Sequence, residues 1–273
     1  YGAVIVPIQN EFKPEQIHNI VNHSESKLLF VGDVVATEIN TDEMPSLEGV
    51  IYLPDFSLVL SRSEKLTYAR ENLNAIFGHK YPKYFRPEHV KYHVDEPEEL
   101  AMINYTSGTT GDSKGVMLTY SQYSAALKAN NECIPVTEKD RVIDFLPFTH
   151  IFERGWAYLC LSEGAELIIN TYPHEIQESM REMHPTCMCS VPRFWEKVYI
   201  AVKAKMDDAG PIQKKLFYHA LAVGRKRNIE YIANCKRPPL ALELEYKIVN
   251  KTILSIVRKQ LGLDNPNIFP TAG

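Results

Sequence analysis

The stretch YTSGTTGDSKGV, residues 105–116, carries the strongest fold signal in this sequence of 273 residues. Gly108 and Gly111 let the backbone approach an anion and turn successive N–H groups toward it. Lys114 adds a mobile positive charge, and hydroxyl groups of the same stretch add hydrogen-bond donors. An apolar run precedes the stretch and a helical pattern follows Thr119. We therefore predict a loop that binds phosphate groups.

Two other kinds of loop share this composition. A Gly/Ser/Thr linker does, but linkers seldom lie between a buried strand and a capped helix, and a linker has no reason to end in Lys-Gly. The Walker A loop of ATPases also contains glycines and a lysine, but its pattern G-x-x-x-x-G-K-[ST] places a hydroxyl directly after the lysine. Here Gly115 follows Lys114, so the spacing disfavours a Walker A loop.

The pattern YTSGTTGxxKGV resembles the phosphate-binding motif of the adenylate-forming enzyme superfamily, which includes acyl-CoA synthetases, luciferases and nonribosomal peptide adenylation domains. The one departure is Ser113, where the family usually has proline, and we expect it to make the loop more flexible. Two further segments, DFLPFTHIFERGW (144–156) and SVPRFWEKVY (190–199), are similar to segments of the long-chain acyl-CoA synthetase branch. Together these segments favour fatty acyl substrates over amino acids.

This resemblance implies an AMP-forming long-chain fatty acid–CoA ligase of fatty acid and lipid metabolism, which uses ATP, Mg²⁺ and CoA. A fatty carboxylate would attack the α-phosphorus of ATP, and the CoA thiol would then displace AMP. The resemblance assigns nucleotide binding to Thr106, Ser107, Gly108, Thr109, Thr110, Gly111 and Lys114, with Lys114 and Thr106 as catalytic residues and Thr106 as the metal ligand. The alternatives are an adenylating enzyme that gives another carboxylate to a carrier protein, and a non-catalytic ATP-binding fold.

The segment 144–156 supplies the predicted substrate pocket. By resemblance, His150, Phe152 and Glu153 lie at the acyl substrate. A histidine that follows a strand is also a common structural hydrogen-bonding group, so a packing role is the alternative for His150. Glu153 and Arg154 suit an ion pair with each other or with neighbouring elements.

Short apolar runs rich in β-branched residues alternate with segments of helical period, which is typical of α/β folds with mostly parallel sheets flanked by helices. The predicted strands are residues 2–7, 28–31, 49–53, 101–105, 141–145, 166–169 and 186–190, and the predicted helices include 13–22, 120–130, 212–232 and 242–261. The resemblance implies a layered αβαβα arrangement. It also implies that residues 1–273 are an incomplete part of the large N-terminal AMP-binding domain, without the small C-terminal domain. We therefore expect little or no ligase activity from this chain alone.

Composition restricts the partners of the protein. The formal charge of −4 gives no basic excess for nucleic acid, and no apolar run approaches the roughly 18 residues of a membrane span. Five scattered cysteines suit reduced thiols in a cytoplasmic protein, and Cys187 and Cys189 lack a further Cys/His pair for a tetrahedral metal site.

We expect small-molecule substrates, namely fatty acid, ATP and CoA. The basic cluster at residues 225–227, near apolar helix positions, is compatible with peripheral membrane contact.

Overall fold

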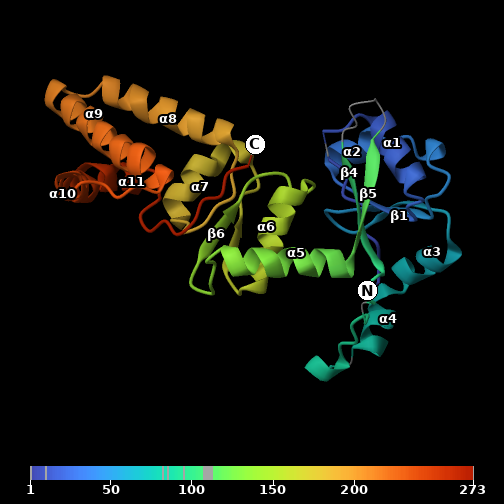
Figure 1. The fold of residues 1–273 in the computed structure, drawn as a ribbon. Helices are drawn as coiled ribbons and strands as arrows, with labels where there is room; N and C mark the ends of the chain where they lie inside the picture. The colour runs from blue at the N-terminus through green and yellow to red at the C-terminus, as the bar shows by residue number, and fades with distance from the viewer. Residues whose placement is uncertain are drawn as a thin grey trace. The chain divides into compact units, whose positions relative to one another are not determined.

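The computed structural model describes residues 2–9, 11–81, 83–84, 86–94, 96–106 and 113–272. The chain divides into two compact units, Tyr1–Ala126 and Leu127–Gly273. Each unit combines strands with covering helices. In Figure 1 the first unit runs from blue to green and the second from green to red.

The first unit contains two sheets. β1 (Leu28–Val31), β2 (Gly49–Tyr52) and β3 (Leu58–Ser61) form one sheet in that order, in which β1 and β2 are parallel and β2 and β3 antiparallel. β4 (Leu100–Thr106) and β5 (Lys114–Thr119) form an antiparallel hairpin. The helices of this unit are α1 (Pro14–His23), α2 (Asp33–Glu38), α3 (Glu64–Glu71) and α4 (Leu73–Lys80), with short turns η1 (Thr41–Glu43) and η2 (Pro87–His89).

The core of the first unit lies where α1 covers the three-stranded sheet. α1 begins at Pro14, whose fixed φ suits the first helical position. The helical period then places Ile17 and Val21 on one side, where they pack with Val31 of β1 and Val50 of β2. All four aliphatic side chains are buried, and each such burial contributes about 1.5–3 kcal/mol to the free energy of unfolding.

The second unit is built around the parallel pair β6 (Arg141–Asp144) and β7 (Glu166–Ile169). α6 (Ile151–Ser162) lies between them in the chain and makes the crossover that a parallel pair requires. Beside β6, Cys187 forms isolated parallel bridges to Val142 and Ile268. The remaining elements are α5 (Tyr120–Cys133), which contains the unit boundary, η3 (Pro173–Glu175), α7 (Ile176–Met183), α8 (Pro192–Asp207), α9 (Pro211–Arg225), η4 (Lys226–Tyr231), η5 (Ile232–Asn234), α10 (Leu240–Val249), η6 (Asn250–Leu254) and α11 (Ser255–Gln260).

The long C-terminal helices each contain a π-helical turn, η4 after α9 and η6 between α10 and α11. α9 and α10 pack through Ala220, Val223, Leu242 and Val249. A π turn adds one residue to a helical turn, so it shifts which side chains face the partner helix. None of the helices in the described part of the chain has the length and apolar character needed to cross a membrane.

The α/β class is confirmed, but several predicted elements need correction. The strands predicted at 28–31 and 166–169 match β1 and β7. Those at 49–53 and 141–145 are one residue longer at the C-terminal end than β2 and β6, and the one at 101–105 is one residue shorter at each end than β4. The strands predicted at residues 2–7 and 186–190 are not formed. These residues, all described, make only isolated bridges to neighbouring segments. The sequence reasoning missed β3 and β5. The phosphate-loop stretch therefore lies at the tip of a hairpin, not between a strand and a helix.

Asp140, just before β6, connects three segments of the second unit. Its carboxylate accepts hydrogen bonds from the hydroxyl of Thr186 (2.6 Å), the amide of Asn267 (3.0 Å) and the backbone N–H of Thr137 (2.9 Å). Burial alone would raise the pKa of Asp140, but the hydrogen bonds from Thr186, Asn267 and Thr137 outweigh it and hold the pKa at about 2. The ionised carboxylate therefore stabilises the junction of these segments.

We predict that Asp140→Asn lowers the free energy of unfolding of the second unit by about 1–3 kcal/mol at pH 7, because the variant loses charge-assisted hydrogen bonds in a buried site. The folded pKa lies below the ordinary 3.8, so this stabilisation is complete above about pH 4 and is lost as the pH falls toward 2. Both tryptophans, Trp156 and Trp195, lie in the second unit, so urea denaturation followed by tryptophan fluorescence measures the effect.

Asp208→Asn is the matched control, because Asp208 is exposed at the end of α8. Its denaturation midpoint should equal that of the unmodified chain. Equal midpoints for Asp140→Asn and the unmodified chain at pH 7 would contradict the stabilising role of Asp140.

Candidate functional site

The tip of the β4–β5 hairpin places two of the predicted nucleotide-binding residues opposite each other. Thr106 ends β4, Lys114 begins β5, and the two are cross-strand partners in the hairpin register. Side chains of directly opposed residues in an antiparallel pair lie on the same face, with Cβ atoms about 4.5–5.5 Å apart. Both residues are exposed. The predicted contacts of Ser107, Gly108, Thr109, Thr110 and Gly111 lie outside the described residues.

The strands that lead into the tip are fixed by Tyr105. Its hydroxyl lies 2.7 Å from Nδ1 of His23 at the end of α1, and its ring packs on the backbone of Gly115. A Cβ atom at residue 115 would lie 3.1 Å from Cζ of Tyr105 and 2.9 Å from Cγ2 of Ile103. Glycine at this position therefore permits the close approach of β4 and β5 just below the loop.

In the second unit, the segment between β6 and α6 carries the predicted pocket residues. His150 is the N-cap of α6, where its Nδ1 accepts a hydrogen bond from the backbone N–H of Phe152 (3.2 Å). The Phe152 side chain is half-buried against the core that contains Val142 and Trp156. His150 itself is exposed at the start of the helix. These two residues therefore also serve packing and capping, and their contact with an acyl substrate stays a prediction.

Glu153 and Arg154 hold the β6–α6 segment from the first turn of α6. Oε1 of Glu153 accepts hydrogen bonds from the backbone N–H groups of Phe145 (2.9 Å) and Leu146 (3.1 Å). Nη1 of Arg154 donates to the backbone oxygen of Phe148 (2.8 Å). Both side chains are buried, with Glu153 0% exposed. These contacts are hydrogen bonds to backbone groups of the preceding segment, whereas the sequence suggested an ion pair.

Asp144 and Glu153 form a buried pair of carboxyl groups. Neither oxygen of Asp144, nor Oε2 of Glu153, has a hydrogen-bond partner among the described residues. Burial, together with the nearby Glu153 carboxylate, raises the pKa of Asp144 to about 8. Burial also raises the pKa of Glu153 to about 7, against the opposing hydrogen bonds from Leu146 and Phe145. The pair therefore binds at least one proton near neutral pH.

A cavity of about 430 Å³ opens beside the same segment, within the usual size range of small-molecule pockets. Its wall is largely apolar and aromatic, and the rings of Phe145 and Phe194 lie 5.1 Å apart. Two cations, Arg193 and Lys197, and His174 are at its edge. The full lining is Phe145, Leu146, Pro147, Pro173, His174, Ile176, Gln177, Val191, Arg193, Phe194, Lys197 and Val198.

The sequence named none of these lining residues individually, although Phe145, Leu146 and Pro147 lie in the segment 144–156 that it assigned to the substrate pocket. Arg193, Phe194 and Lys197 belong to the segment SVPRFWEKVY, which was singled out only as a whole. Their spacing along α8 was the available signal, because residues three and four apart lie on the same face of a helix. His150, Phe152 and Glu153 do not line this cavity. Glu153 contributes indirectly, since it holds the backbone of two residues that do.

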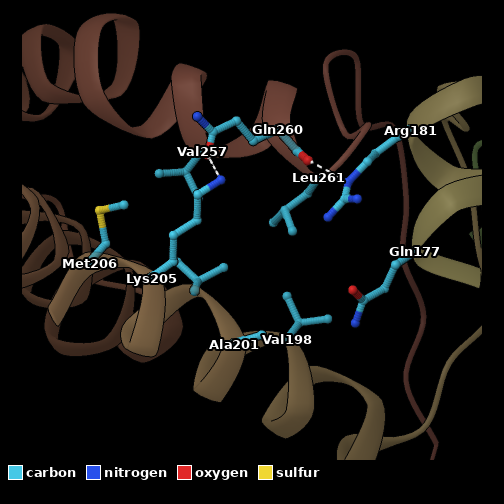
Figure 2. Close-up of a pocket in the computed structure, with 10 residues that line it drawn as sticks. Gln177, Arg181, Val198, Ala201, Lys205, Met206, Val257, Gln260 and Leu261 are labelled. Atoms are coloured by element: carbon cyan, nitrogen blue, oxygen red, sulfur yellow. Dashed lines mark hydrogen bonds between the residues drawn. The ribbon is translucent and has the colours of Figure 1, made fainter. Parts of the chain in front are cut away.

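A second, smaller cavity of about 90 Å³ lies between α7, α8 and α11 (Figure 2). Its two cations are already engaged by Gln260: Nε of Arg181 lies 3.1 Å from the backbone oxygen, and Nζ of Lys205 lies 3.4 Å from Oε1. The volume is well below the roughly 300 Å³ at which small-molecule pockets begin. Val198 and Gln177 line both cavities and therefore separate them.

Cys187 and Cys189 pack as small apolar side chains in the core of the second unit. Burial raises the pKa of both thiols, which keeps them protonated. His184, the histidine nearest to these cysteines in the sequence, pairs with Asp264, with Nδ1 2.9 Å from Oδ2. Within the described ranges, no group of three or more His, Cys, Asp and Glu side chains is arranged to hold a metal ion. The metal-ligand role of Thr106 stays a prediction.

We predict that the second unit loses stability as the pH rises from about 6 to about 8.5, because Asp144 and Glu153 bind protons more tightly in the folded than in the unfolded chain. Asp144→Asn removes one of the two charges and should increase the free energy of unfolding at pH 8.5 by about 1–3 kcal/mol. Thermal denaturation followed by tryptophan fluorescence at both pH values measures this. Asp208→Asn should keep the pH dependence of the unmodified chain. If Asp144→Asn lost as much stability between the two pH values as the unmodified chain, Asp144 would not be a source of the pH dependence.

Comparison with known proteins identifies the family of the chain. The family model of AMP-binding enzymes matches residues 1–235. Long chain acyl-CoA synthetase 3 of Arabidopsis thaliana is 27% identical over 266 residues, which cover 94% of this chain and 40% of the relative. The chain thus spans less than half the length of that relative.

Two solved structures share the fold. A long-chain-fatty-acid-CoA ligase (FadD1) from Archaeoglobus fulgidus has a TM-score of 0.55 and 22% identity, covering 75% of this chain and 37% of that one. The anthranilate CoA ligase AuaEII, solved in complex with anthranoyl-AMP, has a TM-score of 0.55 and 18% identity, covering 70% of this chain and 36% of that one. The predicted superfamily resemblance is confirmed. The chain belongs to the family of AMP-binding enzymes, and its fold is that of part of the N-terminal region of adenylate-forming ligases.

Proposed function

We propose that this chain provides the triphosphate-binding and acyl-binding parts of an AMP-forming long-chain fatty acid–CoA ligase. The observation that carries the proposal is the register of the β4–β5 hairpin, which sets Thr106 opposite Lys114 at the two ends of a Gly/Ser/Thr loop. Membership of the AMP-binding family and the similarity to a long chain acyl-CoA synthetase support it. The pocket beside β6 supports the acyl part.

On the phosphate side, the ammonium group of Lys114 and the hydroxyl of Thr106 would bind the β- and γ-phosphates. Lys114 is exposed, and its ammonium group forms no ion pair with a carboxylate of the described residues. A magnesium ion bound with the triphosphate would neutralise charge that develops on the leaving group. The hydroxyl of Thr106, at the end of β4, fits an ion that takes most of its ligands from water and phosphate.

On the acyl side, the cavity beside β6 would take the aliphatic tail. Phe145, Ile176 and Phe194 offer an apolar wall, so that binding removes hydrocarbon from water. Arg193 and Lys197 at the edge would attract the carboxylate. Glu153 keeps the wall in place because it binds the backbone N–H of Phe145.

The reaction then proceeds in two steps. A carboxylate oxygen forms a bond to the α-phosphorus while the bond from that phosphorus to the bridging oxygen breaks, and pyrophosphate leaves with the electron pair. The CoA thiol next bonds to the acyl carbon, AMP leaves, and the thiol proton passes to solvent. The protein supplies positioning and charge stabilisation. A long aliphatic acid partitions into membranes, so peripheral membrane contact belongs to the same proposal.

An aryl carboxylate is the second candidate substrate. The cavity wall contains the paired rings of Phe145 and Phe194, which would also stack on an aromatic acid. Pyrophosphate release from the intact protein with palmitate, octanoate, benzoate and an amino acid distinguishes the candidates. A preference for benzoate or the amino acid would exclude the fatty acyl assignment.

We predict that Lys114→Ala in the intact protein lowers kcat/KM for palmitate-dependent pyrophosphate release by about 10²–10³-fold, because one cation at the transferring phosphates is removed. Thr109→Ala, at a residue predicted by resemblance to bind phosphate, should also reduce the rate. Lys65→Ala is the control, since Lys65 is an exposed lysine on α3 of the same unit, and it should stay within about twofold. Undiminished turnover in both loop variants would remove the basis of the proposal.

We predict that Val198→Phe raises KM for palmitate more than KM for octanoate, because the larger ring fills the end of the 430 Å³ cavity that Val198 lines. Val202→Phe is the matched control. Val202 lies one turn along α8 and lines the 90 Å³ cavity but not the larger one. A similar change in chain-length preference for both variants would show that the larger cavity does not hold the acyl chain.

A further inference from the structure

The C-terminal helices form a strongly basic block in an acidic chain. Residues 211–260 contain 11 lysines and arginines against 3 glutamates, a formal charge of +8, while the whole chain carries −4. The block consists of α9, η4, α10, η6 and α11 (orange and red in Figure 1). Such a local excess attracts anionic surfaces even when the net charge of the protein is negative.

One side of α10 is used for packing within this block. Leu242 and Val249 are buried against Ala220 and Val223 of α9, and Tyr246 packs against the same cluster. These α10 positions are four and three residues apart, so they share one face of the helix. This face is the inward face of α10.

The opposite side of α10 is aliphatic and exposed. Leu240, Leu244 and Ile248 follow each other at intervals of four residues and are 84%, 62% and 66% exposed. At 100° per residue they lie on the side of the helix opposite Leu242 and Val249. Ile256, 59% exposed on α11, continues the apolar side chains beyond the π turn. An aliphatic ridge of this length on a helix is expected to be covered by something apolar.

Lysines flank this ridge, and carboxylates do not. Lys247 and Lys251 lie on the same side as Leu244 and Ile248, are exposed, and have no ion pair among the described residues. The two glutamates of α10 contact other partners: Glu243 pairs with Arg227 (2.9 Å) and Glu245 with His219 (3.0 Å). The exposed face is therefore aliphatic and cationic.

The basic cluster at residues 225–227 contributes less than the sequence suggested. Arg227 turns inward: its guanidinium lies 4.4 Å from the centroid of the Tyr246 ring and pairs with Glu243. Phe217, one of the apolar residues near this cluster, is 3% exposed and packs in the interior. The amphipathic surface is thus on α10 rather than on the end of α9.

We propose that the exposed face of Leu240–Val249, continued by Ile256, docks on an anionic lipid bilayer with the helix parallel to the membrane surface. Leu240, Leu244 and Ile248 would enter the boundary between headgroups and acyl chains, and Lys247 and Lys251 would meet lipid phosphates. Nucleic acid would use the lysines but leave the aliphatic ridge in water. An acidic protein would need its own apolar groove for a convex ridge, whereas a bilayer accepts one without prior fit.

The docking proposal gives a surface to the peripheral membrane contact of the proposed function, but its observations, the exposure and charge of one helix face, do not depend on the enzymatic site. Its test is sedimentation of the full chain with vesicles and needs no catalysis. We expect binding to vesicles of phosphatidylcholine with phosphatidylglycerol, weak binding to phosphatidylcholine alone, and loss of binding in about 0.5 M NaCl. Absence of binding to the anionic vesicles would overturn the proposal.

Two double variants locate the surface. Lys247→Gln with Lys251→Gln should lower the partition coefficient by about 25-fold, about fivefold for each lysine. Leu244→Ser with Ile248→Ser should lower it by at least about tenfold, because buried aliphatic area is lost. These are exposed positions, so both variants should keep the circular dichroism spectrum of the unmodified chain.

Val34→Ser with Lys65→Gln is the matched control, because it changes one exposed aliphatic residue and one exposed lysine in the first unit. It should leave vesicle binding unchanged. An equal loss of binding in this control would assign the effect to total charge and overturn the proposal.

Binding of DNA that depends on the lysines but not on Leu244 and Ile248, without vesicle binding, would identify a nucleic-acid surface instead. Conversion of a dimer to a monomer by Leu244→Ser with Ile248→Ser would identify a self-association face.

Discussion

The antiparallel pairing of β4 with β5 is the constraint on which the proposed phosphate site depends. It fixes Thr106 opposite Lys114, so that both side chains lie on one face of the hairpin. A slip of one residue would turn Lys114 to the other face. Gly115 resists such a slip, because the Tyr105 ring occupies the space that a Cβ atom would need. The hydrogen bond between Tyr105 and His23 then ties the hairpin to α1. The loop can thus be rich in glycine while its ends stay fixed.

The second unit fixes its segment after β6 by a different means. There, Glu153 and Arg154 bind backbone groups of the segment that precedes their own helix. Burial destabilises ionised carboxylates. Accordingly, the Asp144 oxygens lack hydrogen-bond partners among the described residues, and the pKa of both Asp144 and Glu153 is raised. In return, the segment that forms one wall of the 430 Å³ cavity is held by hydrogen bonds and not by packing alone.

The sequence predicted the elements whose signals are local. β1 and β7 match their predicted ranges because short β-branched runs end at clear turn signals. β5 was missed because the motif drew attention to Lys114 and Gly115 as loop residues, whereas their strand character comes from pairing with β4. The motif identified the superfamily, and the family match confirms it. The cavity could not be predicted, because Phe145, Ile176 and Phe194 meet only after β6, α7 and α8 pack together.

The net charge of the whole chain does not describe the charge of its individual surfaces. The formal charge of −4 argued against nucleic acid as a partner, yet residues 211–260 alone carry +8. What matters to a partner is the charge on one face, and that depends on which carboxylates are already paired. Glu243 and Glu245 are close to Lys247 in sequence, but their ion pairs with Arg227 and His219 turn them away from its face. The pattern of four-residue spacing in Leu240, Leu244 and Ile248 was visible in the sequence. The sequence did not show that this side of α10 is exposed. That follows from the packing of α9 against the opposite side, which carries Leu242 and Val249.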